Sequence, residues 1–401
     1  MKQITITVLM AFFVALQVFA ERVDMREAGV DNQEALKNTE IINNTINRLN
    51  KAGGGTLFFP SGDYLTASIH MKSNITLELE AGATLRFSDN FDDYMPFVEM
   101  RHEGVMMKSF QPLIYATDAE NITIKGEGKL DGQGKAWWKE FFRVLIDLRD
   151  NGKRDINKYQ PLFEQANDMK TLYAETNVDW HSTLDRRFLR PPFIQPLRCR
   201  NVRIEGITIV NSPFWTVNPN FCDNVTVKGV TINNVPSPNT DGINPESCSN
   251  VHISDCHISV GDDCITIKSG RDLQARKIGR PCENITITNC TMLSGHGGVV
   301  IGSEMSGGVK KVTISNCVFD GTDRGIRIKS TRGRGGVVED IRVSNVVMSD
   351  IKREAVVLNL KYSQMKMEKK SERTPVFRNI FVTGLTVRGT QTPLKVDGLP
   401  E

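Results

Sequence analysis

The stretch from Asn239 to Lys329 decides the fold of this chain, because four short polar segments follow one another within it: Asn239-Thr240-Asp241-Gly242, Gly261-Asp262-Asp263, Gly295-His296-Gly297 and Arg327-Ile328-Lys329. Each belongs to a strand-like run that ends in a serine: Ser247, Ser269, Ser303 and Ser330. Asp241 and Asp263 each lie six positions before their own serine, and Asp262 lies seven before. His296 also lies seven positions before its serine. Polar residues far apart in sequence therefore fall into nearly one register.

Apolar residues alternate with polar ones in the same runs. Aliphatic residues recur four and two positions before the serine in three of the copies: Ile265 and Ile267, Val299 and Ile301, and Ile326 and Ile328. Such alternation places side chains on opposite faces of a strand. The intervening positions carry a polar, mostly cationic set: Asn244, Glu246, Thr266, Lys268, Arg327 and Lys329. We predict a buried aliphatic ladder with a polar strip turned outward, and a chain turn at the adjacent Asp262 and Asp263.

Stacking these runs as successive coils of a solenoid predicts one compact polar patch. Equivalent positions on adjacent coils of a parallel solenoid lie about 4.8 Å apart. Three carboxylates so close cannot all ionise freely, so at least one pKa should rise. An acid and a base in one site are what glycoside hydrolysis requires. Two fixed cations, Arg327 and Lys329, suit a substrate that carries carboxylates.

Each motif alone has a plainer interpretation. An Asp-Gly pair such as Asp241-Gly242 is usually a turn. Asp262-Asp263 alone is more often a calcium or turn pair than a catalytic one, and one histidine between glycines is weak evidence. Turn residues have no reason to share a register with a histidine and two cations, so the joint pattern favours a site.

The length, the net charge and the first residues of the chain limit the classes of protein to which it can belong. With 401 residues the chain can bury a large core in one elongated domain or two compact ones. A formal net charge of +3 does not indicate a nucleic-acid binder. Residues 1–20 have the pattern of a signal peptide, with Lys2, an apolar run from Ile4 to Phe19 and a small-residue exit at Ala20. We predict cleavage near Ala20 rather than a membrane anchor, and a secreted or periplasmic chain with no membrane association.

All eight cysteines lie between Cys199 and Cys317, and several recur at one point of a repeat, as in Cys222-Asp-Asn and Cys248-Ser-Asn. Cysteines in a secreted chain often form disulfides. The repeated placement predicts stacked, buried thiols as readily as bridges.

A phrase that begins with asparagine recurs along the chain, as in Asn201-Val-Arg-Ile-Glu-Gly and Asn224-Val-Thr-Val-Lys-Gly. Copies that start at 201, 224, 250 and 284 are separated by 23, 26 and 34 residues. This period, with short strands and no intervening helices, is typical of a β-solenoid whose coils bury their apolar positions only by stacking. A propeller blade needs a longer unit with a regular closing signature, and a sandwich would not repeat the phrase.

Three segments depart from the repeats. Residues 31–49 have helical spacing before Gly53-Gly54-Gly55, which predicts a helix that caps one end of the core. Residues 136–190 lack the phrase, and 137–148 and 159–173 within them look helical. We predict an insertion that is either a wall beside a substrate cleft or a structural flap. Residues 361–370 are rich in Lys and Met and predict a solvated loop.

With the four motifs in this order, the chain resembles glycoside hydrolase family 28, the polygalacturonases of the pectinase group. The similarity covers nearly the whole mature chain, including Lys72-Ser73-Asn74 and Gly82-Ala83-Thr84-Leu85. The resemblance implies an all-β fold, a right-handed parallel β-helix in one catalytic domain over residues 21–401. It implies hydrolysis of α-1,4-galacturonosyl linkages of pectin with inversion, without a cofactor or a metal. We expect a monomer that acts on pectic polysaccharide or oligogalacturonides and binds no nucleic acid.

The resemblance also implies roles for the motif residues. Asp262 is the general acid, Asp241 and Asp263 together activate the attacking water, and His296 tunes or holds the acid. Inversion requires about 6.5–9.5 Å between acid and base carboxyls. Arg327 and Lys329 bind a galacturonate carboxylate. Further candidate substrate-binding residues are Asn239, Lys268 and Arg271. Arg271 belongs to a basic group with Arg276, Lys277, Arg280, Arg332 and Arg334. This group either lines extra subsites or lies in a solvated loop.

Three alternatives stay open. A rhamnogalacturonan or other substituted-pectin hydrolase of the same family is disfavoured by the complete motif set. A β-helix pectate lyase would need calcium ligands and an arginine base, and a non-catalytic polysaccharide-binding solenoid would have no need of the intact acidic patch. Endo and exo attack are both open, and the insertion slightly favours exo because it would block one end of the groove.

Overall fold

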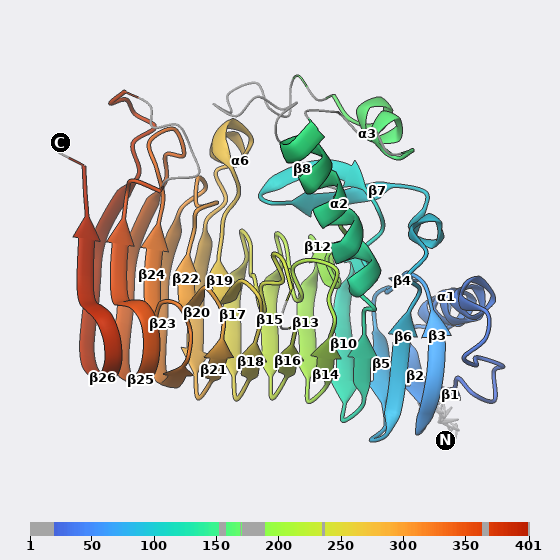
Figure 1. Ribbon diagram of the computed structural model, residues 1–401. Coiled ribbons are helices and arrows are strands. Elements are labelled where there is room, and N and C mark those ends of the chain that lie inside the picture. The colour runs from blue at the N-terminus through green and yellow to red at the C-terminus, as the bar shows by residue number, and fades with distance from the viewer. Residues whose placement is uncertain are drawn as a thin grey trace, which may run out of the picture.

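The chain winds into a stack of coils, and each coil adds strands to parallel ladders that run the length of the molecule (Figure 1). The computed structural model describes residues 20–151, 158–168, 170, 189–234, 237–362 and 369–399. The predicted signal peptide at residues 1–20 lies almost wholly outside them. Successive strands pair in parallel with nearly constant register, as the repeated phrases predict.

Three ladders form the faces of the solenoid. The first contains β1 (Glu21–Asp24), β2 (Gly55–Phe59), β5 (Ile75–Leu79), β10 (Glu120–Gly126), β13 (Arg200–Glu205), β15 (Asp223–Lys228), β17 (Ser249–Ser254), β20 (Cys282–Thr288) and the first parts of β23 (Val309–Asp320), β25 (Val337–Asn359) and β26 (Val376–Asp397). The second contains β3 (Gly62–Thr66), β6 (Ala83–Phe87), β11 (Lys129–Asp131), β14 (Thr208–Val210), β16 (Thr231–Asn233), β18 (His257–Ser259), β21 (Thr291–Ser294) and later parts of β23, β25 and β26. The third contains β4 (Ile69–His70), β9 (Ile114–Thr117), β12 (Ile194–Leu197), β19 (Asp263–Ile267), β22 (Gly297–Ile301), β24 (Ile326–Lys329) and the ends of β25 and β26.

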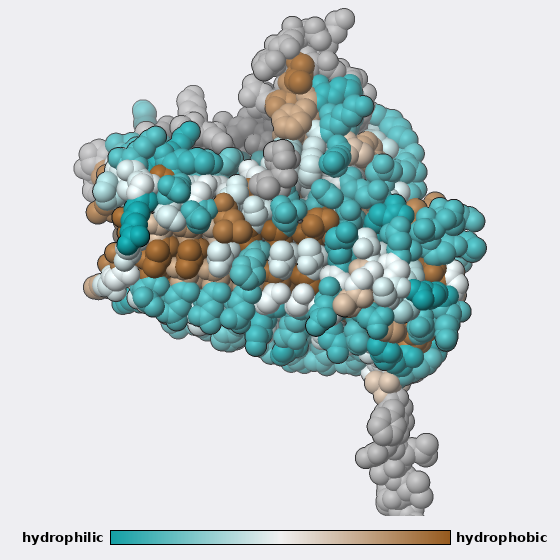
Figure 2. Space-filling model, turned by 60° about the horizontal axis from the view of Figure 1, so that its bottom comes forward, coloured by the Kyte–Doolittle hydropathy of each residue, from teal (hydrophilic) through white to brown (hydrophobic). Residues whose placement is uncertain are grey.

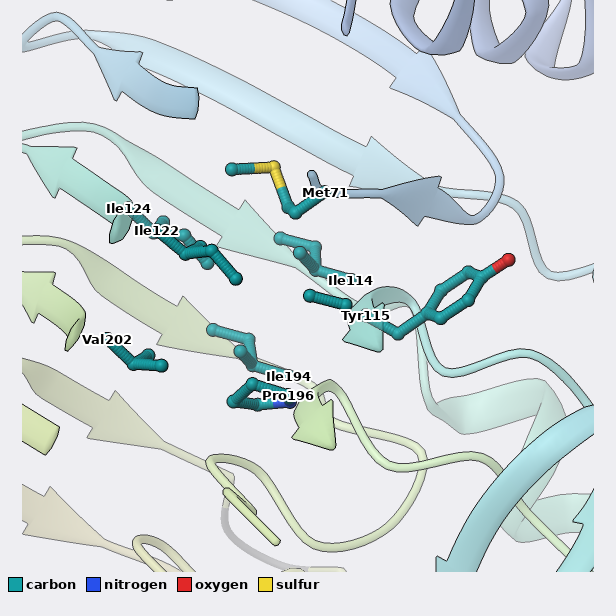
Figure 3. A pocket seen from close by; sticks show the side chains of 9 residues that line it. Met71, Ile114, Tyr115, Ile122, Ile124, Ile194, Pro196 and Val202 are labelled. Atoms are coloured by element: carbon teal, nitrogen blue, oxygen red, sulfur yellow. The ribbon is translucent and has the colours of Figure 1, made fainter. Parts of the chain in front are cut away.

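The core is a set of aliphatic columns inside the coils. Val227 pairs with Ile204 on one side and Ile253 on the other, and Ile253 pairs in turn with Ile287. All four are fully buried, so each coil's apolar face is covered only by its neighbours. A void of about 10 Å³ remains where Met71, Ile114, Ile122 and other aliphatic side chains converge (Figure 3). Its apolar lining and small size predict that it stays dry.

Asparagine begins the repeated phrase because it turns the chain into each strand. Asn121, Asn201 and Asn224 have φ values of 57°, 57° and 58°, in the left-handed region that asparagine tolerates better than most residues. Their amides also stack between coils: Nδ2 of Asn201 donates to Oδ1 of Asn121 at 2.8 Å, and Asn224 donates to Asn201 at 2.7 Å. One residue type thus makes the turn and links it to the next coil.

The cysteines are free thiols, all buried. Two of them on successive coils are in contact: the backbone N–H of Cys248 donates to Sγ of Cys282 at 3.4 Å. The predicted stacking of thiols is therefore observed.

Several exposed apolar side chains lie on the second ladder. Leu293, Val318 and Val347 lie on successive coils of the second ladder and are 49%, 42% and 46% exposed. Figure 2 shows apolar side chains gathered in a band across the coils, between polar margins. No helix among the described residues is both long and apolar enough to cross a membrane.

The predicted capping helix is α1 (Ala35–Lys51), which packs against the first coils at the N-terminal end (Figure 1). Its buried face carries Ile42, Ile46 and Leu49, whose spacing along one helical face explains the sequence pattern. The helix begins later and ends two residues beyond the predicted range.

The insertion contains the two predicted helices, α2 (Lys135–Asn151) and α3 (Gln160–Ala166); residues 169 and 171–173 of the second prediction lie outside the described part. The helices stand beside an antiparallel hairpin of β7 (Val98–His102) and β8 (Val105–Ser109), above the N-terminal half of the solenoid (Figure 1). Aromatic contacts hold this group together. The ring centres of Trp137 on α2 and Phe91 on η1 (Phe91–Tyr94) lie 4.3 Å apart. Phe163 of α3 stacks on Phe97 with ring centres 4.5 Å apart.

Replacing Ile253 by Ala should lower the free energy of unfolding by about 2–5 kcal/mol, because two neighbouring coils leave no room for the cavity to collapse. The matched control is His252→Ala, whose side chain is exposed on the same strand and should change stability by less than about 0.5 kcal/mol. Urea unfolding of both variants measures the difference, and equal losses would contradict the stacked core.

Candidate active site

The third ladder brings the four sequence motifs together. A single β-bridge between Ile243 and Ile265 joins the coil of Asp241 to β19. Strand β19 pairs with β22, and β22 pairs with β24. The polar side chains come from four successive coils: Asp241; Asp262 and Asp263; His296; and Arg327 and Lys329. Asp263 begins β19 and Asp262 directly precedes it, so the pair lies at the expected turn.

The polar strip beside these residues is covered, whereas we expected it to face solvent. Three of its members are fully buried: Asn244, Glu246 and Thr266. The hairpin β7–β8 places Arg101 with its Nε 3.5 Å from Oε1 of Glu246, and Trp215 packs under the ammonium group of Lys268 at 4.7 Å. The side chains do point away from the aliphatic ladder, but the hairpin and the coil of Trp215 lie over them.

Three carboxylates form the centre of the site: one oxygen from each of Asp241, Asp262 and Asp263 lies within 4.8 Å of the other two. Asp241 is 2% and Asp263 1% exposed, while the side chain of Asp262 is 19% exposed. These are the nearest oxygens only; the expected separation of about 6.5–9.5 Å is one between whole carboxyl groups and stays a prediction. Like charges this close, with little water to screen them, cannot all ionise.

Asp241 is the carboxyl that keeps a proton. Burial raises its pKa well above the ordinary value, and the negative charges of Asp262 and Asp263 raise it further, against Lys268 and Lys329. Its Oδ2 accepts a hydrogen bond from the hydroxyl of Thr266 at 3.3 Å. The predicted rise of one pKa in the cluster therefore falls on Asp241.

Asp262 forms an ion pair with His296, whose Nδ1 lies 3.1 Å from Oδ1. Burial alone would raise the pKa of Asp262, but the hydrogen bond and positive charge of His296, with Lys329 and Lys268, lower it to about 2. The same hydrogen bond raises the pKa of His296 above its ordinary value. Asp262 is thus ionised in the unliganded site, although the resemblance gives it the role of proton donor.

Asp263 is bound by a cation on one oxygen and open on the other. Nζ of Lys329 donates to Oδ2 at 2.8 Å. Oδ1 has no hydrogen-bond partner among the described residues, and Arg327 Nη1 lies 3.9 Å from it. A buried carboxylate oxygen with no partner is costly, so this atom is placed to accept a hydrogen bond from a water or a substrate hydroxyl.

Tyr362 is a site residue that we did not predict. Its ring lies under both cations, 5.6 Å from the guanidinium carbon of Arg327 and 5.3 Å from Nζ of Lys329. We had assigned its segment, residues 361–370, to a solvated loop, of which 363–368 lie outside the described part. Its N–H bonds the carbonyl of Ser330 at 3.1 Å. Only the aromatic residue within a Lys-rich run could have signalled it.

Two of the predicted substrate-binding residues have acidic partners instead of open surfaces. Lys268 is 3% exposed, and its Nζ donates to Glu304 at 2.9 Å. The side chain of Arg271 is 12% exposed and lies 3.5 Å from Glu103. Lys268 therefore acts on the site through its charge, and Arg271 joins the hairpin to the coil after β19.

Two members of the basic group that follows Arg271 are bound by protein partners. Arg334 is buried and donates to Asp272 at 3.0 Å. Arg276, on α6 (Asp272–Ile278), donates to the carbonyl of Gly333 at 2.9 Å. The structure therefore does not present these two guanidinium groups as free anion subsites.

Asn239 is linked to the site through its amide. Its Nδ2 lies 3.4 Å from Oδ2 of Asp262, and its Oδ1 accepts a hydrogen bond from Arg190 at 2.8 Å. Both ends of the amide therefore have protein partners.

The three carboxylates have the ligand types of a metal site. Cationic side chains already lie at this position, however: Lys329 is hydrogen-bonded to Asp263, and His296 to Asp262. These bonds neutralise the cluster in the way that a metal would, so we infer no metal from the acidic residues.

Comparison with known proteins assigns the family. The model of glycosyl hydrolases family 28 matches residues 178–397, which contain every residue of the carboxylate cluster. This chain belongs to glycosyl hydrolases family 28. It is therefore a glycoside hydrolase, as the motifs predicted.

Relatives of this family 28 chain include both endo- and exo-acting enzymes. It is 30% identical over 382 residues to a probable polygalacturonase of Vitis vinifera, covering 93% of this chain and 70% of that one. It is 30% identical to an endo-polygalacturonase of Pectobacterium carotovorum, covering 74% of this chain and 65% of the relative. The solved exopolygalacturonase of Thermotoga maritima superposes with a TM-score of 0.82 and 35% identity, over 96% of this chain and 84% of that chain. The predicted right-handed parallel β-helix is confirmed.

Replacing Asp241 by Asn should stabilise the protein at pH 7 while it impairs catalysis. The folded pKa of Asp241 is raised above the unfolded value of about 3.9, so stability is lost as the pH rises from that value through the folded pKa. The neutral amide removes this loss, so Tm should rise on the order of 2 °C at pH 7 and match wild type near pH 3.

Calorimetry at both pH values measures this effect, with Asp89→Asn as the control because Asp89 is exposed and remote from the cluster. A variant that is less stable than wild type at pH 7 would show that Asp241 is ionised without cost.

Proposed function

We propose that this chain is a polygalacturonase that hydrolyses α-1,4-galacturonosyl linkages of pectin with inversion, attacking from a chain end. The observation that carries the proposal is the convergence of three carboxylates, His296 and two cations from four coils of a family 28 chain. The names of its polygalacturonase relatives support the substrate class.

Arg327, Lys329 and Tyr362 bind the substrate. Galacturonate carries a carboxylate at every sugar, and guanidinium and ammonium groups are the side chains that bind carboxylates best. The ring of Tyr362 lies beside both cations and offers an apolar face to a sugar. Nη1 of Arg327 lies 3.9 Å from Oδ1 of Asp263, beyond hydrogen-bond distance, so its N–H groups remain available to the ligand.

Asp262 gives its proton to the glycosidic oxygen, and Asp241 with Asp263 takes a proton from the attacking water. The oxygen of that water bonds to the anomeric carbon as the glycosidic bond breaks. The open Oδ1 of Asp263 holds the water, and the raised pKa of Asp241 makes it the better proton acceptor of the two bases. One turnover therefore ends with Asp241 protonated and Asp262 ionised.

This end state is the one that the unliganded site prefers, since the pKa of Asp241 is raised and that of Asp262 lowered. The next turnover requires the proton to return from Asp241 to Asp262 across the cluster, over a separation of at most 4.8 Å. The three groups thus titrate as one unit with a shared proton. The net charge of the site does not change during this transfer.

The hairpin β7–β8 and helix α6 support exo attack. The carbonyl of Gly104 at the hairpin tip accepts a hydrogen bond from the N–H of Arg271 at 3.1 Å, and Arg101 donates to Ser247 at 3.1 Å. These bonds join the hairpin to the coils of Asp241 and Asp263, and the body of the hairpin lies on their N-terminal side (Figure 1). A polymer bound across Arg327 and Lys329 would end there, with its terminal sugar at the carboxylates.

We further propose one catalytic domain over residues 21–401 that acts outside the cytoplasm as a monomer. Pectin is a large extracellular polymer, which supports export of an enzyme that degrades it. The core columns run without a break through the coils and support a single domain.

A product profile on polygalacturonic acid with a chelator present tests the function. Monogalacturonate alone from the first minutes is expected, because the hairpin admits a chain end only. A ladder of oligomers would replace exo by endo attack. No product would contradict the homogalacturonan substrate and direct the assay to rhamnogalacturonan and substituted pectins, and an unsaturated product would show a lyase.

The Asp262→Asn variant should lose at least about 100-fold in kcat, because the amide cannot protonate the leaving oxygen. Asp89→Asn serves as the control, with unchanged rates. Wild-type rates in the Asp262 variant would place the acid elsewhere.

A further inference from the structure

We infer that Arg190, at the end of the insertion, is a positioning residue that holds Asp262 in its catalytic orientation by acting through Asn239. The inference rests on the proposed function, because it takes Asp262 as the proton donor. It gives the insertion a role beyond that of wall or flap.

The guanidinium of Arg190 is buried against two aromatic rings. It lies 4.1 Å from the ring centre of Phe141 on α2 and 5.1 Å from that of Phe214 on the solenoid. Arg190 is 2% exposed and Phe141 8%. Helix α2 thus closes over the guanidinium and fixes it between the insertion and the coil.

Three hydrogen bonds fix the direction of the guanidinium. Nη1 of Arg190 donates to the carbonyls of Pro213 at 3.0 Å and Pro238 at 2.6 Å, and Nη2 donates to Oδ1 of Asn239 at 2.8 Å. Pro238 and Asn239 form the turn that leads to Asp241. Arg190 therefore holds the turn by its backbone and by a side chain.

The bond to Arg190 determines which way the amide of Asn239 points. A guanidinium has only donors, so the atom that faces it has to be the oxygen. The NH₂ group of Asn239 is then left toward Asp262, with Nδ2 3.4 Å from Oδ2. His296 occupies the other oxygen of Asp262 at 3.1 Å. Without Arg190 the amide is free to rotate, and Oδ2 of Asp262 loses its donor.

Small errors in the position of an acid are costly in rate: a displacement of about 1 Å can cost roughly 100-fold. The proposed substrate-binding residues, by contrast, are Arg327, Lys329 and Tyr362, none of which contacts Arg190 among the described interactions. Loss of Arg190 should therefore lower kcat much more than it changes KM.

Arg190→Lys and Arg190→Met test the inference. Both should lower kcat about 10- to 100-fold with KM within about threefold, and Lys should recover part of the loss because it keeps one donor. The acid limb of the pH profile should move to higher pH. Loss of a donor to the ionised carboxylate raises the pKa of Asp262, which is the first carboxyl of the coupled cluster to lose its proton as the pH rises. The charged groups around Asp262 stay unchanged in both variants: Asp241, Asp263, Lys268, His296 and Lys329.

A double-mutant cycle with Asn239→Leu tests the route. If Arg190 acts through Asn239, the double variant should be no worse than Asn239→Leu alone. Additive losses would show that Arg190 acts by another path.

The matched control is Arg334→Lys. Arg334 is also fully buried and donates to Asp272 at 3.0 Å, but contacts no carboxylate of the cluster. Its replacement should lower Tm without moving the pH profile. If Arg190→Lys behaves as Arg334→Lys does, its role is structural only and the inference is wrong.

Titration of the His296 imidazole by NMR separates this inference from the proposed function. The hydrogen bond to Asp262 raises the pKa of His296, so a displaced Asp262 should let that pKa fall toward about 6.5 in Arg190→Met. This readout needs no substrate. An inactive wild type would overturn the proposed function and leave the titration intact, whereas an unchanged His296 titration would overturn the role of Arg190.

Discussion

The parallel hydrogen-bonded stacking of coils is the constraint on which the rest of the structure depends. Because each coil pairs with the next in nearly constant register, a residue type that recurs in sequence recurs one strand spacing away in space. Asn201 and Asn224, 23 residues apart in sequence, stack by this rule. Asp241 and Asp263 approach each other for the same reason, and a β-helix can thus build a dense polar site from residues of several coils.

The density of the site has an electrostatic consequence. Carboxylates within 4.8 Å of one another and nearly buried can share a proton only if cations limit their repulsion. Lys329 and His296 bind two of the three directly, and Lys268 adds charge from beneath while Glu304 compensates it. Asp241, with no cation bonded to it among the described contacts, keeps the proton. The raised pKa of Asp241 lowers stability at neutral pH, a cost that the proposed proton exchange within the cluster would explain.

Much of this arrangement could be predicted from the sequence, because the repeats carry their own register. Alignment on the four serines placed Asp241, Asp262 and His296 together, and the asparagine phrase indicated a solenoid. Contacts from outside the repeats were not predictable. Arg101, which covers the polar strip, is 146 positions from its partner Ser247. Arg190 is 49 positions from its partner Asn239, and no sequence pattern relates the residues of either pair. Tyr362 lies in a segment whose composition indicates only a polar loop.

The nearest oxygens of the three carboxylates lie within 4.8 Å of one another, which makes stereochemistry the most direct test of the central claim, that Asp241 and Asp263 activate a water and do not attack the sugar themselves. Carboxyls about 5–5.5 Å apart are typical of retaining enzymes, in which one is a nucleophile. Here Asp241 is almost fully buried and Asp263 is held by Lys329, which disfavours either as a nucleophile. Proton NMR of the first products from an α-linked oligogalacturonide distinguishes the two mechanisms. The account predicts that the β-anomer appears first and mutarotates later; the α-anomer appearing first would contradict it.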